Sequence, residues 1–262
     1  MRTASKGAAE LASRHLVMAG RLIDDDPATA YQHAQAARKL LPRLAVVREA
    51  VGLCAYANGE WALALAELRA SRRINGSVEH LPVMADCERG LGRPERALAL
   101  AKSADAAALD RVGAVELRIV ISGARRDLGQ FDAAVVALQG RDLDRARRDP
   151  WSARLFYAYA DALLAAGRLS EAREWFVAAA VVDDDASTDA IDRVGDLDAA
   201  SGRPEHAAVP ERAVGAAPDS GGAPPAQTPD AADISLRQPQ VANADPASRP
   251  VQAELVLLFE EP

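Results

Sequence analysis

Apolar residues along this chain fall into helix-compatible segments that are rich in alanine and leucine. Single turn-forming residues separate these segments. The stretch "ERGLGRPERALALAKSA", Glu88 to Ala104, places Gly92 between two such segments. Similar stretches follow downstream as "RRDLGQFDAAVVAL" and "LLAAGRLSEAREWF". Alanine and leucine favour helices, and glycine supplies the backbone freedom that a helix end needs before a sharp reversal. The pattern therefore predicts pairs of helices joined by short turns.

The helix pairs recur at a nearly constant interval. The turn residues of the six units are Asp25, Gly59, Gly92, Gly129, Gly167 and Gly202, at successive spacings of 34, 33, 37, 38 and 35 residues. An alanine stands five residues after each of them, at Ala30, Ala64, Ala97, Ala134, Ala172 and Ala207. A small side chain at one fixed point lets two paired helices approach closely. The longer spacings place extra residues in "KSADAAALDRVG" and "GRDLDRARRDP", which we expect to connect one pair to the next.

These residues resemble the tetratricopeptide repeat (TPR) family, whose 34-residue unit has W-x2-L-G-x2-Y in its first helix and A-x3-F in its second. The fifth unit is the best match, with Phe156, Tyr159, Ala160, Ala172 and Phe176. The resemblance implies an all-α, right-handed solenoid of about six helix pairs, which we assign to residues 8–214. In the sixth pair, Pro210 interrupts the predicted second helix.

Composition narrows the classes of function. The chain of 262 residues has a net charge of −7, and residues 215–262 contribute −5 of it, with 7 acidic and 2 basic side chains. A nearly neutral body argues against non-specific nucleic-acid binding. The few lysines among 31 basic residues indicate a GC-rich bacterial, actinobacterial-like composition. The N-terminus has no uninterrupted apolar segment, and no later run could span a bilayer, so we expect a cytoplasmic protein without a membrane segment.

Candidates for catalytic chemistry have simpler structural interpretations. "GLGRPE" lacks the third glycine of a dinucleotide-binding turn and follows a helix instead of a strand. Cys54 and Cys87 lie one repeat apart and are expected to be small buried residues without a disulfide. The aspartate runs "DDDP" and "DDDAS" are expected to cap helix ends, and the four histidines are dispersed. We therefore predict no enzyme activity, no metal site and no cofactor.

The TPR resemblance places partner binding on the concave face, which the first helices line. Projected onto this sequence, that face contains Glu79, Asp86, Arg89, Glu116, Arg126, Arg154, Tyr157, Asp161, Asp189, Asp192 and Asp196. Tyr157 is expected to be partly exposed. Arginines there would fork onto a carboxylate or an acidic peptide, unless they pair with Asp86, Asp127 and Asp161 as ordinary ion pairs.

The sequence therefore favours a non-catalytic adaptor that binds a protein or peptide of unknown identity. The alternative is a regulatory or sensor solenoid that binds a small acidic ligand. RNA binding through helical repeats is disfavoured by the net charge.

Residues 215–262 form a different region, rich in proline, alanine and glycine, that is predicted to be disordered. It ends in "AELVLLFEEP". There Leu255, Leu257, Leu258 and Phe259 form an apolar run that resembles a short docking motif. Two alternatives stay open: the run docks on the solenoid or a partner, or it is a frayed terminus.

Overall fold

The computed structural model describes residues 6–202, and these residues form helices and connecting loops only. The helices are α1 (Lys6–Leu22), α2 (Pro27–Leu40), α3 (Ala45–Ala57), α4 (Trp61–Asn75), α5 (Leu81–Gly90), α6 (Pro94–Ala101), α7 (Arg111–Asp127), α8 (Phe131–Leu138), α9 (Ser152–Ala165), α10 (Leu169–Val182) and α11 (Ala190–Ala200). A short 3-10 helix, η1 (Ala104–Ala108), precedes α7. The predicted connection "KSADAAALDRVG" therefore lies between α6 and α7 in its first part, as expected. Its last residues, from Arg111, belong to α7.

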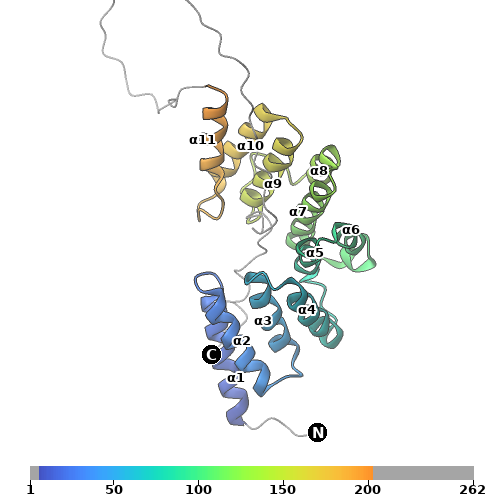
Figure 1. Ribbon diagram of the computed structural model, residues 1–262, viewed down its shortest axis with the longest axis vertical. Helices are drawn as coiled ribbons and strands as arrows, with labels where there is room; N and C mark the ends of the chain where they lie inside the picture. Colours follow the sequence, from blue (N-terminus) through green and yellow to red (C-terminus); the bar gives the residue numbers. More distant parts are fainter. Residues whose placement is uncertain (1–5, 203–262) are drawn as a thin grey trace, which may run out of the picture.

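The helices stack as antiparallel pairs along a curve whose ends are α1 and α11 (Figure 1). Each second helix packs on its own first helix and on the first helix of the next pair. The predicted all-α, TPR-like solenoid is therefore confirmed, with five complete pairs and the first helix of a sixth among the described residues. The second helix predicted around Ala207, the region 215–262 and its apolar run Leu255 to Phe259 lie outside them.

A left-handed glycine ends the first helix at five of the six predicted turns, the exception being the turn at Asp25. Gly92 has a φ of +69°, a conformation that costs a residue with a Cβ atom roughly 1 kcal/mol or more. The Arg93 backbone N–H donates to the Glu88 carbonyl oxygen at 2.9 Å, which is the closing bond of a Schellman motif. The same bond recurs after Gly59, Gly129 and Gly167. The glycine in the quoted stretch is therefore a helix terminator.

The alanine that follows each turn lies at the contact between paired helices. Ala30, Ala64, Ala97, Ala134 and Ala172 are all at most 1% exposed. Four apolar clusters succeed one another along the stack, each shared by neighbouring pairs. The cluster of unit five contains several aromatic side chains, and Phe156 and Tyr159 both meet Trp175 edge-on. The core is therefore a row of inter-helix contacts instead of one central cluster.

Two second helices are short. α6 and α8 have 8 residues each, against 14 in α2 and α10 and 15 in α4. A loop follows each of these two short helices. The loop after α6 contains η1, and residues 139–151 form the loop after α8. These loops accommodate the longer spacings of units three and four without altering the order of the stack.

Candidate functional site

Polar side chains link successive first helices on the inside of the curve. We call this set the inner-face ladder. Its pairs are Glu49–His80, Tyr56–Asp86, Arg89–Asp127, Glu116–Arg154, Arg126–Asp161, Tyr157–Asp189 and Asp161–Arg193. The ladder begins with the pair between α3 and His80, the residue before α5. It ends at Asp189, the residue before α11, and at Arg193 in α11. Eight of the eleven residues that the sequence projects onto the concave face belong to the ladder. The other three, Glu79, Asp192 and Asp196, are exposed.

Arg89 connects α5 to α7. Its Nη1 lies 2.8 Å from Asp86 Oδ1, and its Nε lies 2.8 Å from Asp127 Oδ2. The guanidinium sits against Gly123 of α7, where an added Cβ would lie 2.3 Å from Arg89 Cζ. The missing side chain at Gly123 therefore makes the room that this ion pair needs.

Arg154 connects α9 to α7 by a two-pronged ion pair. Its Nε and Nη2 donate to the two carboxylate oxygens of Glu116 at 3.0 and 2.8 Å. Burial raises the pKa of Glu116, and the positive charge of Arg154 opposes that rise. Burying a carboxylate is costly unless it is paired and hydrogen-bonded, and this geometry supplies both.

Asp161 of α9 joins three helices. One of its oxygens pairs with Arg126 of α7, and the other accepts from Arg193 Nη2 of α11 at 3.1 Å. The Arg193 guanidinium also lies over the Phe176 ring, 5.3 Å from its centroid. A single carboxylate thus connects the fourth, fifth and sixth units.

Two tyrosines form the hydrogen bonds toward the two ends of the ladder. The Tyr56 hydroxyl donates to Asp86 at 2.6 Å, and Tyr157 is hydrogen-bonded to Asp189. Burial and these carboxylates raise the pKa of both phenols. The expectation that Tyr157 is partly exposed is wrong, because its side chain is 3% exposed and packs edge-on against Phe176.

Three of the four arginines of the ladder are largely withdrawn from solvent. The side chains of Arg89, Arg126 and Arg154 are 12%, 20% and 16% exposed, and that of Arg193 is 32% exposed. Each of them pairs with a carboxylate, as in the ion-pair interpretation that the sequence left open. The inner face is therefore less arginine-centred at its accessible surface than the sequence predicts.

The sequence did not indicate a second set of buried carboxylates, which lies outside the inner-face ladder. Glu67 is held by Arg38 and Arg48, Glu88 by Arg69, and Asp142 by Arg111 and Arg118. The spacing of 19 residues in Arg48–Glu67 and Arg69–Glu88 is the one signal that the sequence offered. These carboxylates are 4%, 1% and 6% exposed, so they stabilise the stack and are not available to a ligand.

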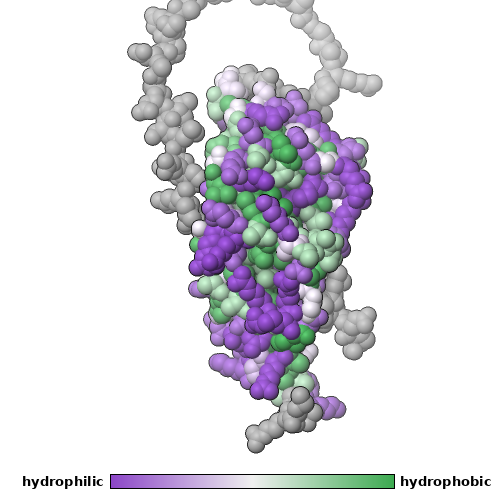
Figure 2. All heavy atoms as spheres, turned by 90° about the vertical axis from the view of Figure 1, so that its right-hand side faces the viewer, coloured by the Kyte–Doolittle hydropathy of each residue, from purple (hydrophilic) through white to green (hydrophobic). Residues whose placement is uncertain are grey.

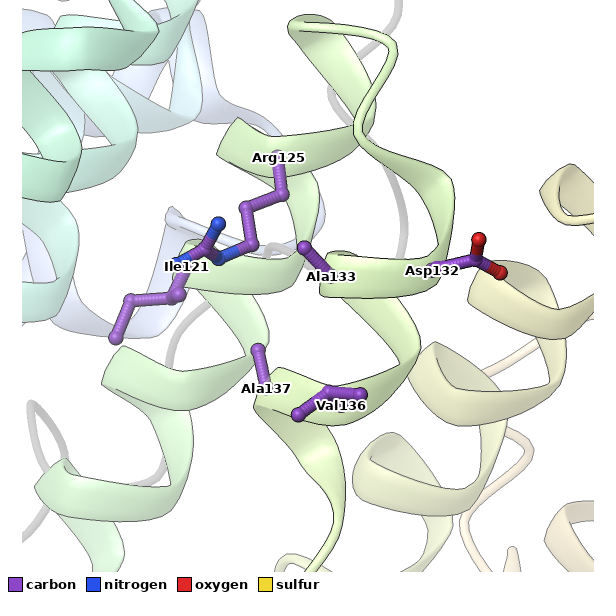
Figure 3. Close-up of a pocket in the computed structure, with 6 residues that line it drawn as sticks. All are labelled: Ile121, Arg125, Asp132, Ala133, Val136 and Ala137. Atoms are coloured by element: carbon purple, nitrogen blue, oxygen red, sulfur yellow. The ribbon is translucent and has the colours of Figure 1, made fainter.

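The outer side, where α4, α6 and α8 lie, has interrupted apolar surface between polar side chains (Figure 2). A shallow hollow there lies between α7 and α8 (Figure 3). It is lined by Ile121, Arg125, Asp132, Ala133, Val136 and Ala137. Most of its lining is aliphatic, and it brings together no group of acids, bases or nucleophiles.

The cysteines and histidines of the described residues do not come together in a catalytic or metal-binding site. Cys54 and Cys87 are free and buried, as predicted, and burial raises the pKa of Cys54 to about 12. His15 and His33 are not dispersed as expected, because their Nδ1 atoms lie 2.9 Å apart across α1 and α2. Within residues 6–202, no three side chains of His, Cys, Asp or Glu gather as metal ligands.

Both aspartate runs lie at helix ends, as predicted, but only the first caps a helix, whereas Asp183 orders the loop that follows α10. Asp26 accepts the Thr29 backbone N–H at 3.1 Å at the start of α2, which lowers its pKa. Asp183 accepts the backbone N–H groups of Ser187 and Thr188 after α10, at 2.9 and 2.8 Å. None of the helices in the described part is long and apolar enough to cross a membrane.

No protein-family profile matches the chain, and no curated protein matches it by sequence. Among solved structures, the chain is similar to PilF of Pseudomonas aeruginosa, with a TM-score of 0.50. The two sequences are 13% identical, and the match covers 76% of this chain and 87% of that chain. At this identity the likeness concerns the fold, a TPR-like helical repeat.

Proposed function

We propose that this protein is a non-catalytic scaffold that binds a protein or peptide segment on its inner face. A solenoid presents equivalent side chains of successive units along one extended surface. The observation that carries the proposal is the inner-face ladder, which ties α3, α5, α7, α9 and α11 together through paired side chains. A surface that is already ordered loses little conformational freedom when a partner binds.

A catalytic role has less support. Glu116 is the buried carboxylate of the ladder whose pKa is raised, but Arg154 occupies both of its oxygens. The hollow lined by Ile121 and Val136 contains no ladder residue and lacks titratable groups arranged for chemistry. The alternative of a small acidic ligand has no specific observation in its favour, because the arginines that would receive it already hold carboxylates.

Site-specific photo-crosslinking on the full chain tests the proposal. A photoreactive amino acid is placed at Glu79 or Asp192, which are exposed on the inner face, and as matched controls at Val136 or Val177, which are exposed on second helices. In extract from the source cells, we expect adducts of discrete mass from the inner positions, suppressed by excess unmodified protein. Adducts from the outer positions alone would contradict the assignment of binding to the inner face.

A further inference from the structure

The charge that the inner face shows to solvent is negative, and we propose that the partner bound there is a cationic segment rich in arginine or lysine. The proposal rests on the proposed function and specifies the chemistry of the partner. It reverses the expectation from sequence, in which arginines on this face receive an acidic ligand.

The first step is the difference in exposure between the two signs of charge. Arg89, Arg126 and Arg154 are 12%, 20% and 16% exposed, Arg193 is 32% exposed, and all four lie against carboxylates. In contrast, Glu79, Asp127, Asp189, Asp192 and Asp196 are all exposed. An approaching partner therefore meets carboxylates before it meets guanidinium groups.

The second step concerns the orientation of α11. Asp192 and Asp196 lie one turn apart, and they stand 10 and 6 residues before Gly202, as Tyr157 and Asp161 of the inner-face ladder stand before Gly167. Their side of α11 is turned toward the inside, because Arg193 reaches Asp161 of α9 and Asp189, just before α11, pairs with Tyr157. The exposed aspartates of α11 consequently continue the surface that the ladder begins on α5, α7 and α9.

The third step is the segregation of charge over the whole solenoid. Residues 6–202 contain 26 basic and 29 acidic side chains. The inner face has four arginines, which are Arg89, Arg126, Arg154 and Arg193. Its nine carboxylates are Glu49, Glu79, Asp86, Glu116, Asp127, Asp161, Asp189, Asp192 and Asp196. The remaining described surface and core therefore hold 22 basic and 20 acidic side chains, so the negative excess is confined to the inner face.

The concave inner face attracts cations more strongly than its net charge alone indicates. Low-dielectric walls concentrate the field of like charges in a concave surface and raise the local concentration of an oppositely charged ligand. The chain's own residues 215–262 have 7 acidic and 2 basic side chains, the same sign as the inner face. Electrostatics therefore favours a partner molecule over the apolar run Leu255 to Phe259 as the occupant.

Fluorescence anisotropy with three labelled peptides tests the proposal on the full chain. One is a twelve-residue peptide of alternating lysine and leucine, the second replaces each lysine by glutamate, and the third copies residues 250–262. The inner variant is Glu79→Gln/Asp192→Asn/Asp196→Asn. The matched control Glu95→Gln/Glu171→Gln/Glu174→Gln removes the same charge from exposed positions of α6 and α10.

We expect the lysine peptide to bind most tightly and to lose affinity as salt screens the interaction. Three exposed charges contribute a few tenths to one kcal/mol each, so the inner variant should weaken its binding about tenfold, and the control less than about twofold. Equal loss in the two variants would overturn the proposal, since the attraction would then be unspecific.

Two further results separate this inference from the proposed function. Tighter binding of the glutamate peptide or of the 250–262 peptide, lost in the inner variant, would refute a cationic partner while keeping the inner face as the binding surface. Failure of all three peptides to bind, together with no adducts from the inner photoreactive positions, would refute both.

Discussion

Buried carboxylates are the residues on which the stack of helices most depends. Glu67, Glu88, Glu116 and Asp142 are each at most 6% exposed. An arginine of another helix holds each of the three glutamates, and Arg118 of α7 holds Asp142 in the loop after α8. A buried ion pair adds little stability over a well-packed apolar pair, but removing one partner leaves an uncompensated charge. These pairs therefore make the structure intolerant of single substitutions.

Replacing Arg154 tests this cost. Arg154→Met keeps an apolar stem but leaves the Glu116 carboxylate without the bonds at 3.0 and 2.8 Å. We expect a loss of about 3 kcal/mol in the free energy of unfolding, measured with urea. The control Arg168→Met disrupts the exposed pair with Glu171 and should cost less than about 1 kcal/mol. Similar losses in both variants would contradict the role of burial.

The pKa of Glu116 gives a pH-dependent prediction. Because burial raises this pKa above its ordinary value of 4.5, the folded chain holds the proton at pH values where the unfolded chain has released it. This residue's contribution to stability therefore falls as pH rises above 4.5. Glu116→Gln has no carboxyl group to titrate at this position. The free energy of unfolding of the variant minus that of the native chain should therefore increase with pH. A difference that is independent of pH would contradict the raised pKa.

Two helical glycines should respond oppositely to alanine. At Gly123 an added Cβ would lie 2.3 Å from Arg89 Cζ and displace its ion pairs, whereas at Gly195 of α11 it would meet no atom within 4 Å. We expect Gly195→Ala to raise stability by about 0.5–1 kcal/mol through helix propensity. Gly123→Ala should show no gain or a loss of up to about 2 kcal/mol. Thermal unfolding distinguishes the two, and equal gains would show that Arg89 relaxes freely.

At the scale of the element, each helix pair is set by its turn and its alanine. The glycine φ values of 65–76° at the five turns end the first helix, and the buried alanine fixes how closely the second helix returns. Both are local determinants that repeat from unit to unit. This explains why pairs with second helices as short as 8 residues keep the same arrangement as longer ones.

Enlarging one of these alanines tests the helix contact. Ala172 is fully buried in the core that contains Phe156 and Phe176, so Ala172→Leu should overpack it and cost about 1–3 kcal/mol. The matched control is Ala62→Leu in α4, which is exposed and should change stability by less than about 0.5 kcal/mol. Chemical denaturation of both variants checks the difference, and equal tolerance would show that the pair readily separates.

At the scale of the whole molecule, the solenoid is coupled through nearest neighbours. The main contacts of each pair are with the pairs beside it, and ladder residues such as Asp161 contribute the polar part of that coupling. In a stack of this kind, a local loss is felt mainly by adjacent units. A defect near α11 should therefore leave the opposite end intact.

Hydrogen exchange can measure how far such a defect spreads. Asp161→Asn removes the charge that attracts Arg126 and Arg193, so amides of α11 should exchange severalfold faster. Amides of α1 to α4, which are several units away, should keep their native rates. Uniform acceleration along the chain would mean that the solenoid opens as a single cooperative body.

The sequence by itself determined the helix pairs and their order. Gly92 and its equivalents and the alanine five residues on act through contacts within one unit, and such local constraints remain visible as a regular spacing. The inner-face residues were also found, because repeat register assigns Arg89, Arg126 and Asp161 to equivalent helices.

Only the tertiary structure decided which charges pair and which reach solvent. Arg89 meets Asp127 and Arg154 meets Glu116 across 38 residues, and several carboxylates in each unit were equally available by spacing. The burial of Tyr157 likewise depends on Phe176 and on Asp189 before α11. These outcomes follow from how successive units rotate and stack. The stacking brings together side chains whose separation in the sequence does not by itself indicate a contact.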